Sequence, residues 1–129
     1  MKRFKGGRSV IVGMKLLMHI LTKNYNLGID NATLSSKEII NKTKEEFNEV
    51  VEAIEIYEND KSLVNLKEII KETFDLIQMC ILILWRSHRR ALDLDEPNLI
   101  QDINIEHKDK LIGERQWTIE TGIEIDIKE

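Results

Sequence analysis

Acidic side chains at helical spacing are the residues of this chain that could carry out chemistry. Glu45, Glu46 and Glu49 form one cluster, and Glu72 and Asp75 form a second that begins 23 residues after Glu49. Residues three or four apart on a helix are neighbours on its surface, so each cluster would present its carboxylates together. Carboxylate oxygens from two facing helices would form a cage for a hard divalent cation.

The first cluster belongs to a longer series of glutamates, at residues 46, 49, 52, 55 and 58. A solvated helix face explains such a series without any site. Each three-residue step turns the helix by about 300°, so the series cannot face one point. Glu46 lies nearest the apolar stripe, which is formed by Phe47, Val50, Val51 and Ile54. We therefore expect Glu46 and Glu49 to share a metal ion with Glu72 and Asp75. Glu55 and Glu58 are expected to be solvated.

The identity of the metal follows from the ligand types. A di-iron bundle requires Glu-x-x-His on two helices, and none of His19, His88 and His107 has a glutamate three positions earlier. We expect these histidines to be surface or packing residues. A site made only of carboxylate oxygens favours Mg²⁺, with Mn²⁺ as the alternative.

Four helical segments would position these acids. Apolar periodicity, serine caps and the breaker residues predict helices over residues 9–23, 35 or 36–58, 62–91 and 95–113. Residues 24–33, rich in Asn and Gly, are predicted to be a loop. The tail changes period, because Ile123, Ile125 and Ile127 alternate with acids as in a strand. Such a strand would pair with another, for example the same strand of a second subunit, or the tail would be disordered.

Composition limits the class of protein. A chain of 129 residues with 33% charged residues and one proline is expected to form a single, mostly helical domain. The formal net charge of -4 argues against a general nucleic-acid binder. The single cysteine, Cys80, predicts a reducing, cytoplasmic location. The basic N-terminal segment lacks a cleavage site, and the apolar run 79–85 is too short to cross a bilayer, so no membrane partner is expected.

The two clusters together resemble the motif of the MazG-like, all-α nucleoside triphosphate pyrophosphohydrolases. That motif is Glu-Glu-x-x-Glu, a spacer, and Glu-x-x-Asp, and the spacer here, residues 50–71, is 22 residues long. The similarity covers about residues 44–84. The resemblance implies a MazG-like four-helix bundle completed by dimerisation or tetramerisation. It also implies Mg²⁺-dependent cleavage of a (d)NTP to a (d)NMP and pyrophosphate, for cleansing of the nucleotide pool.

The resemblance also implies roles for individual residues. Glu46, Glu49, Glu72 and Asp75 would bind Mg²⁺, and Glu45, or alternatively Glu52, would orient or deprotonate the attacking water. Phosphate contacts are assigned to two cations in a basic stretch near the C-terminus, Lys110 and Arg115, which would otherwise only complement a helix dipole.

Recognition of the base is the least defined part of the resemblance. Trp85 or Trp117 would stack on a base or pack in a core or interface. The segment 77–80 departs from the tyrosine-containing pattern of the family, so base preference is open.

Two alternative functions without catalysis also fit the sequence. In the first, the chain is a helical interaction or regulatory module whose acids form a solvated face. In the second, the basic N-terminal helix serves as an adaptor to a membrane or nucleic acid through Lys2, Arg3, Lys5 and Arg8.

Overall fold

The computed structural model describes residues 2–5, 8–11 and 13–128, with side chains from residue 13 onward. The chain divides into two compact units. One is the continuous segment Met18–Pro97, and the other combines Met1–Leu17 with Asn98–Glu129. The structure is mostly helical, as predicted, and a single domain stays a prediction.

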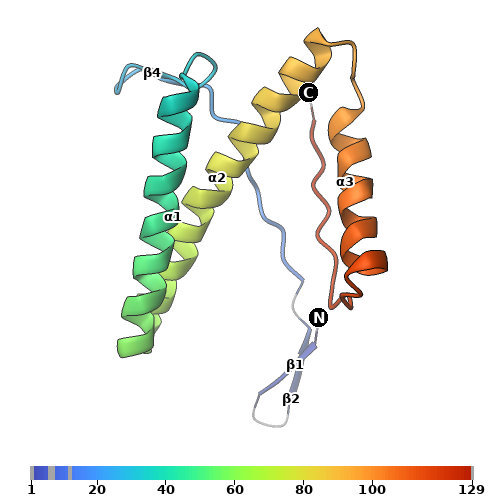
Figure 1. Ribbon diagram of the computed structural model, residues 1–129. Coiled ribbons are helices and arrows are strands. Elements are labelled where there is room, and N and C mark those ends of the chain that lie inside the picture. Colours follow the sequence, from blue (N-terminus) through green and yellow to red (C-terminus); the bar gives the residue numbers. More distant parts are fainter. Residues whose placement is uncertain (1, 6–7, 12, 129) are drawn as a thin grey trace. The chain divides into compact units, whose positions relative to one another are not determined.

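Helix α1 (Figure 1) spans Ser36–Asn59. It begins at a complete capping box. The Ser35 hydroxyl accepts from the backbone N–H of Glu38 at 3.1 Å, and the Ser35 N–H donates to the Glu38 carboxylate at 3.2 Å. These bonds satisfy two polar groups that a helix end would otherwise leave without partners. The predicted helix and its start are confirmed, and it ends at Asp60, where the backbone becomes extended.

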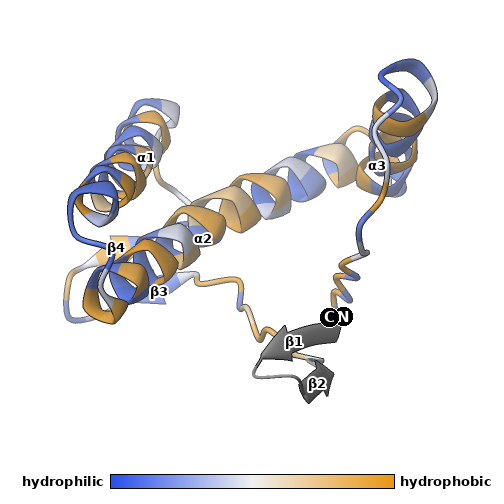
Figure 2. Cartoon of the chain, turned by 90° about the horizontal axis from the view of Figure 1, so that it is seen from below, coloured by the Kyte–Doolittle hydropathy of each residue, from blue (hydrophilic) through white to orange (hydrophobic). Residues whose placement is uncertain are grey.

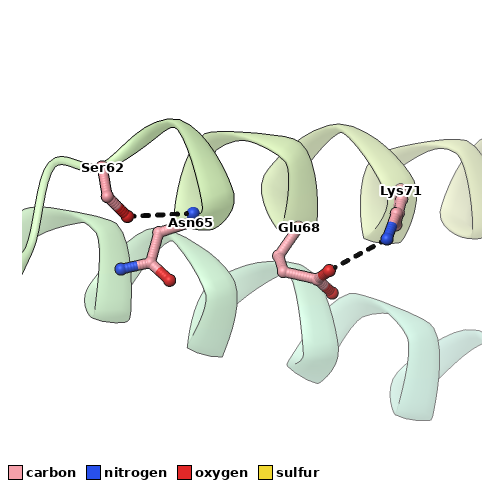
Figure 3. Close-up of polar contacts among 4 residues, drawn as sticks. All are labelled: Ser62, Asn65, Glu68 and Lys71. Atoms are coloured by element: carbon pink, nitrogen blue, oxygen red, sulfur yellow. Dashed lines mark hydrogen bonds and ion pairs between the residues drawn. The ribbon is translucent and has the colours of Figure 1, made fainter.

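Helix α2, Leu63–Asp93, follows after a three-residue connection. Ser62 caps it, accepting from the Asn65 N–H at 3.2 Å, and the Asn65 side chain donates to the Asp60 carbonyl at 2.8 Å. Figure 3 shows this cap and, one turn later, the Glu68–Lys71 ion pair at 3.1 Å. The third predicted helix is confirmed.

The two long helices, α1 and α2, pack against each other in an antiparallel arrangement (Figure 1). Their shared core is thin, because among the residues with described side chains only Ala53, Leu82 and Ala91 are fully buried. Many large apolar side chains on both helices stay exposed, and orange bands of apolar residues run along them in Figure 2. This hairpin therefore leaves apolar surface that nothing within Met18–Pro97 covers.

A short hairpin leads into α1. Strand β3, Lys23–Asn24, pairs with β4, Ile29–Asp30, across a turn in which Gly28 takes a φ of 66°. Glycine adopts this left-handed conformation without steric cost. The sequence had predicted only a loop here, because runs of two residues are too short to show strand periodicity.

Arg86 of α2 holds the chain just after this hairpin. Its guanidinium donates to the carbonyls of Asn31 (3.3 Å) and Leu34 (2.7 Å). The side-chain amide of Gln78, also on α2, donates to the carbonyl of His19 at 2.9 Å. The segment that precedes α1 is therefore attached to α2 at two points.

The predicted helix over residues 9–23 is wrong. Strand β1, Lys2–Lys5, pairs antiparallel with β2, Arg8–Ile11, and residues 13–22 form neither helix nor strand. Met14 and Leu17 are exposed, so the apolar face that suggested a helix has no surface to pack on. Most helix stability comes from such packing rather than from propensity. Val12 and the side chains of Lys2, Arg3, Lys5 and Arg8 lie outside the described residues.

Helix α3, Leu99–Asp109, starts later than predicted and continues into a π-helical turn, η1, Lys110–Glu114. Asp95 adopts a φ of 58° and Pro97 lies in a turn, so the acids at residues 95 and 96 do not cap the helix. The predicted strand in the tail is absent from residues 117–128. The described residues therefore hold three α-helices, and the four-helix bundle stays a prediction. None of these helices combines the length and apolarity needed to cross a membrane.

Candidate metal centre

Four carboxylates converge where α1 and α2 face each other. Glu46 and Glu49 come from α1, Glu72 and Asp75 from α2, and one oxygen of each lies within 4.8 Å of the others. Opposite oxygens around a Mg²⁺ ion lie about 4 Å apart, since each Mg–O bond is about 2.0–2.1 Å. The cluster thus needs little adjustment to hold such an ion.

The local sequence explains why the four acids meet. Within each pair the residues are three apart and share one side of their helix. Ala53, one turn beyond Glu49, is only 7% exposed, and its small side chain allows close approach of the helices. Nearby threonines satisfy their own hydroxyls, because Thr43 donates to the Ile39 carbonyl at 2.7 Å and Thr73 to the Ile69 carbonyl at 2.6 Å. The carboxylates therefore have no hydroxyl donor from these neighbours.

Two oxygens of the cluster are buried without a hydrogen-bond partner, Oε2 of Glu46 and Oε2 of Glu72. Buried polar atoms in native proteins are normally paired, because an unpaired one costs about 1–3 kcal/mol. Glu46, Glu49 and Glu72 are half-buried, whereas Asp75 is exposed. Unpaired acceptors beside an open position suit a cation that reaches the cluster from solvent.

Two acids of the cluster, Glu46 and Glu72, have a raised pKa. Burial is the largest cause for Glu46, followed by Glu49, Asp75 and Glu45, and the pKa rises from 4.5 to about 7. For Glu72, hydrogen bonding to Glu49 is the largest cause of a raised pKa, followed by burial and the charges of Glu49, Asp75 and Glu68. Like charges in a shared site oppose ionisation of all its members.

No lysine or arginine whose side chain the structure describes offsets this charge. Among the residues whose side chains are described, no lysine or arginine forms an ion pair with any of the four acids. Lys71, the neighbour of Glu72, pairs with Glu68 instead (Figure 3). A divalent cation would supply the missing positive charge and would favour the ionised carboxylates.

The remaining predicted acids lie outside the cluster. Glu45 is exposed beside it and contributes to the raised pKa of Glu46. Glu52, Glu55 and Glu58 are exposed, and Glu58 pairs with Lys61 at 3.7 Å. The solvated face predicted for the outer glutamates is therefore confirmed.

Lys110 and Arg115 belong to the other unit. They lie at the two ends of the η1 turn, where the Arg115 N–H donates to the Lys110 carbonyl at 2.9 Å, and both side chains are exposed. Trp117, also in that unit, is 66% exposed. Their proposed phosphate and base contacts stay predictions.

Trp85 of α2 is half-buried and carries the Arg89 guanidinium over its ring at 4.9 Å. A cation on the ring face is a stabilising contact of its own. His19, His88 and His107 are not part of the acidic cluster.

Some relevant residues escaped the sequence reasoning. Glu68 lies one turn before Glu72 and raises its pKa, a relation that its i, i+4 spacing could have indicated. Arg86 and Gln78 bind backbone carbonyls more than 50 residues away in sequence. No local pattern signals such contacts.

Comparison of the chain with protein-family models, curated proteins and solved structures gives no match. The resemblance to MazG-like proteins therefore rests on the two acidic motifs and their spacing. The convergence of the four motif acids is a separate observation, made on the fold alone.

Proposed function

We propose that this chain is a Mg²⁺-dependent nucleotide pyrophosphohydrolase that cleaves a (d)NTP to a (d)NMP and pyrophosphate. The observation that carries the proposal is the meeting of four acids within 4.8 Å, with two of their oxygens buried and unpaired. An oxygen-only site of this kind suits Mg²⁺, with Mn²⁺ as a substitute. The spacing of the same acids supports the choice of reaction.

Each residue then has a defined task. A Mg²⁺ ion held there would supply positive charge beside the phosphate oxygens and would make a water molecule more acidic. Glu46, Glu49, Glu72 and Asp75 hold that ion. Glu45, which is exposed next to Glu46, would accept a proton from the attacking water, and Glu52 is the alternative. Lys110 and Arg115 are the proposed phosphate contacts.

We further propose that the active form is a homodimer or homotetramer. Phe47 is 54% exposed on α1 and Ile70 is 49% exposed on α2, and each is flanked by other exposed apolar residues. Phe47 follows Glu46 by about 100° around the helix, so the apolar stripe turns away from the acids. A second copy packed on this stripe would complete a four-helix bundle and leave both metal clusters accessible.

The test is pyrophosphate release from a panel of (d)NTPs with Mg²⁺. Glu49→Gln and Asp75→Asn should each reduce release at least about 100-fold, since metal-site changes commonly cost this much. Glu55→Gln is the matched control, because Glu55 is exposed and lies about 180° around the helix from Glu46. Equal activity in all four proteins, or no release from any nucleotide, would disprove the enzymatic proposal.

The second candidate is a non-catalytic interaction module. The large exposed apolar residues of α1 and α2 favour it, because such surfaces commonly bind other proteins. Calorimetry with Mg²⁺ separates the two candidates. A module with a solvated acidic face should bind no ion stoichiometrically and should be unaffected by Glu46→Gln.

A further inference from the structure

The C-terminal tail is an exposed segment with strand periodicity and no strand partner. Ile119, Ile123, Ile125 and Ile127 are 66%, 81%, 75% and 66% exposed. Acids occupy the intervening positions 120, 124 and 126. In an extended strand, successive residues point to opposite faces. Positions 123–127 would therefore have one isoleucine face and one acidic face.

The β1–β2 hairpin has the reverse charge pattern. The register pairs Arg3 with Val10 and Lys5 with Arg8, and cross-strand partners share a face of the sheet. One face of the hairpin backbone thus holds positions 3, 5, 8 and 10, three of which are basic in the sequence. The other face holds positions 2, 4, 9 and 11, which include Phe4 and Ile11.

The two patterns are complementary if the tail is a third strand. A two-stranded hairpin is marginally stable alone, and both of its edges offer unpaired backbone groups. A strand added to the β1 edge would extend the sheet and lie directly beside positions 3 and 5. Its acidic face would then lie on the side of positions 3, 5 and 8, and its isoleucines on the side of Phe4 and Ile11. A slip by one residue would exchange the two faces, so only registers that differ by an even number of residues satisfy both.

We propose that residues 119–127 of one copy of this chain add as a third strand to the β1–β2 hairpin of a second copy. Hairpin and tail belong to the same unit of the single chain, yet residues 117–128 form no strand there. Reciprocal exchange of tails in a dimer would cover two exposed tails and two open hairpins at once. The proposal does not depend on the metal cluster or on nucleotide hydrolysis.

A charge exchange in the full-length protein tests the pairing and its connectivity. One variant carries Glu124→Lys and Asp126→Lys, and the other carries Arg3→Glu and Lys5→Glu. Each variant alone places like charges on tail and hairpin, which destabilises neighbouring strands. The self-association constant, measured by sedimentation velocity, should fall at least about tenfold for each variant, which corresponds to about 1.4 kcal/mol.

Mixing the two variants is the decisive measurement. In a mixed dimer both tail–hairpin pairs have opposite charges again, whereas pairing within one chain stays mismatched. The mixed dimer should therefore form with an association constant within about threefold of wild type, a difference of less than about 1 kcal/mol. A mixture that associates no better than either variant alone overturns the proposal.

Two further variants separate the pairing from misfolding. Ile125→Pro removes a backbone donor from the middle of the strand and should weaken association, whereas Thr118→Pro, outside the strand, should not. Far-ultraviolet circular dichroism should be unchanged in both, because the tail lies outside every helix. Equal association of the two proline variants would also overturn the proposal.

Discussion

Glu46 is the acid of the cluster at which burial and like charge together raise the pKa. Its pKa of about 7 in the folded chain lies above its ordinary value of 4.5. Between these values the folded state binds more protons than the unfolded state, so stability falls as the pH rises through this window. Binding of a cation has the opposite dependence, because it requires ionised carboxylates.

This contrast predicts how pH and Mg²⁺ affect unfolding. Without metal, the melting temperature should be lower at about pH 8 than at about pH 5, because Glu46 must ionise in the folded state. Mg²⁺ should raise it at about pH 8 and have little effect at about pH 5. Differential scanning calorimetry measures both effects. Glu46→Gln should reduce the pH dependence, and a wild-type melting temperature that rises with pH in EDTA would contradict the assignment.

Among the contacts between elements, those of Arg86 attach the chain just before α1 to α2. Its guanidinium donates to the backbone carbonyls of residues 31 and 34, and residue 34 directly precedes the Ser35 cap. A hydrogen bond from a charged group contributes about 1.5–3 kcal/mol. These two hydrogen bonds, called the Arg86 clamp here, therefore fix the end of α1 nearest to the β3–β4 hairpin. The short connection after Asn59 fixes the other end.

Loss of this clamp should destabilise the protein. Arg86→Met should lower the free energy of unfolding by about 1–3 kcal/mol in urea denaturation, because two carbonyls lose a charged donor. Arg90→Met is the matched control. Arg90 is exposed and makes only a surface ion pair of 3.9 Å with Asp93, and such pairs contribute about 0–1 kcal/mol. Equal destabilisation by the two changes would show that the clamp has no special role.

The elements also show what a sequence can reveal. The helices over α1 and α2 were predictable from serine caps, breaker residues and periodic apolar positions, and so was the meeting of the four acids. The N-terminal segment failed because its periodicity resembles that of a helix, whereas its apolar side chains find no packing partner. The tail failed for a related reason, since alternation describes a strand that forms only where another strand pairs with it.

At the scale of the whole molecule, many large apolar side chains stay exposed in a single copy. Only three side chains among those described are fully buried, whereas Phe47, Ile54 and Ile70 are each more than 40% exposed. Monomeric proteins rarely expose large contiguous apolar patches. The proposed assembly of copies through α1 and α2 would cover this surface.

A charge in this stripe should therefore weaken assembly through α1 and α2. Phe47→Glu should shift the protein toward monomer in light scattering coupled to size exclusion, because burial of an unpaired charge is costly. Helical content should be retained, since Phe47 is exposed in the single chain. Glu55→Lys, a charge change on an already solvated position of α1, serves as the control. A monomeric wild type would contradict the proposed assembly.

The three-residue connection between α1 and α2 has a consequence for the order of folding. All four acids of the cluster lie within a span of 30 residues, on two helices joined by one short loop. Closing so small a loop costs little chain entropy, and helical hairpins with local contacts form in about microseconds to milliseconds. During synthesis, this acidic cluster would be complete as soon as α2 has left the ribosome, before α3 and the tail have emerged from it.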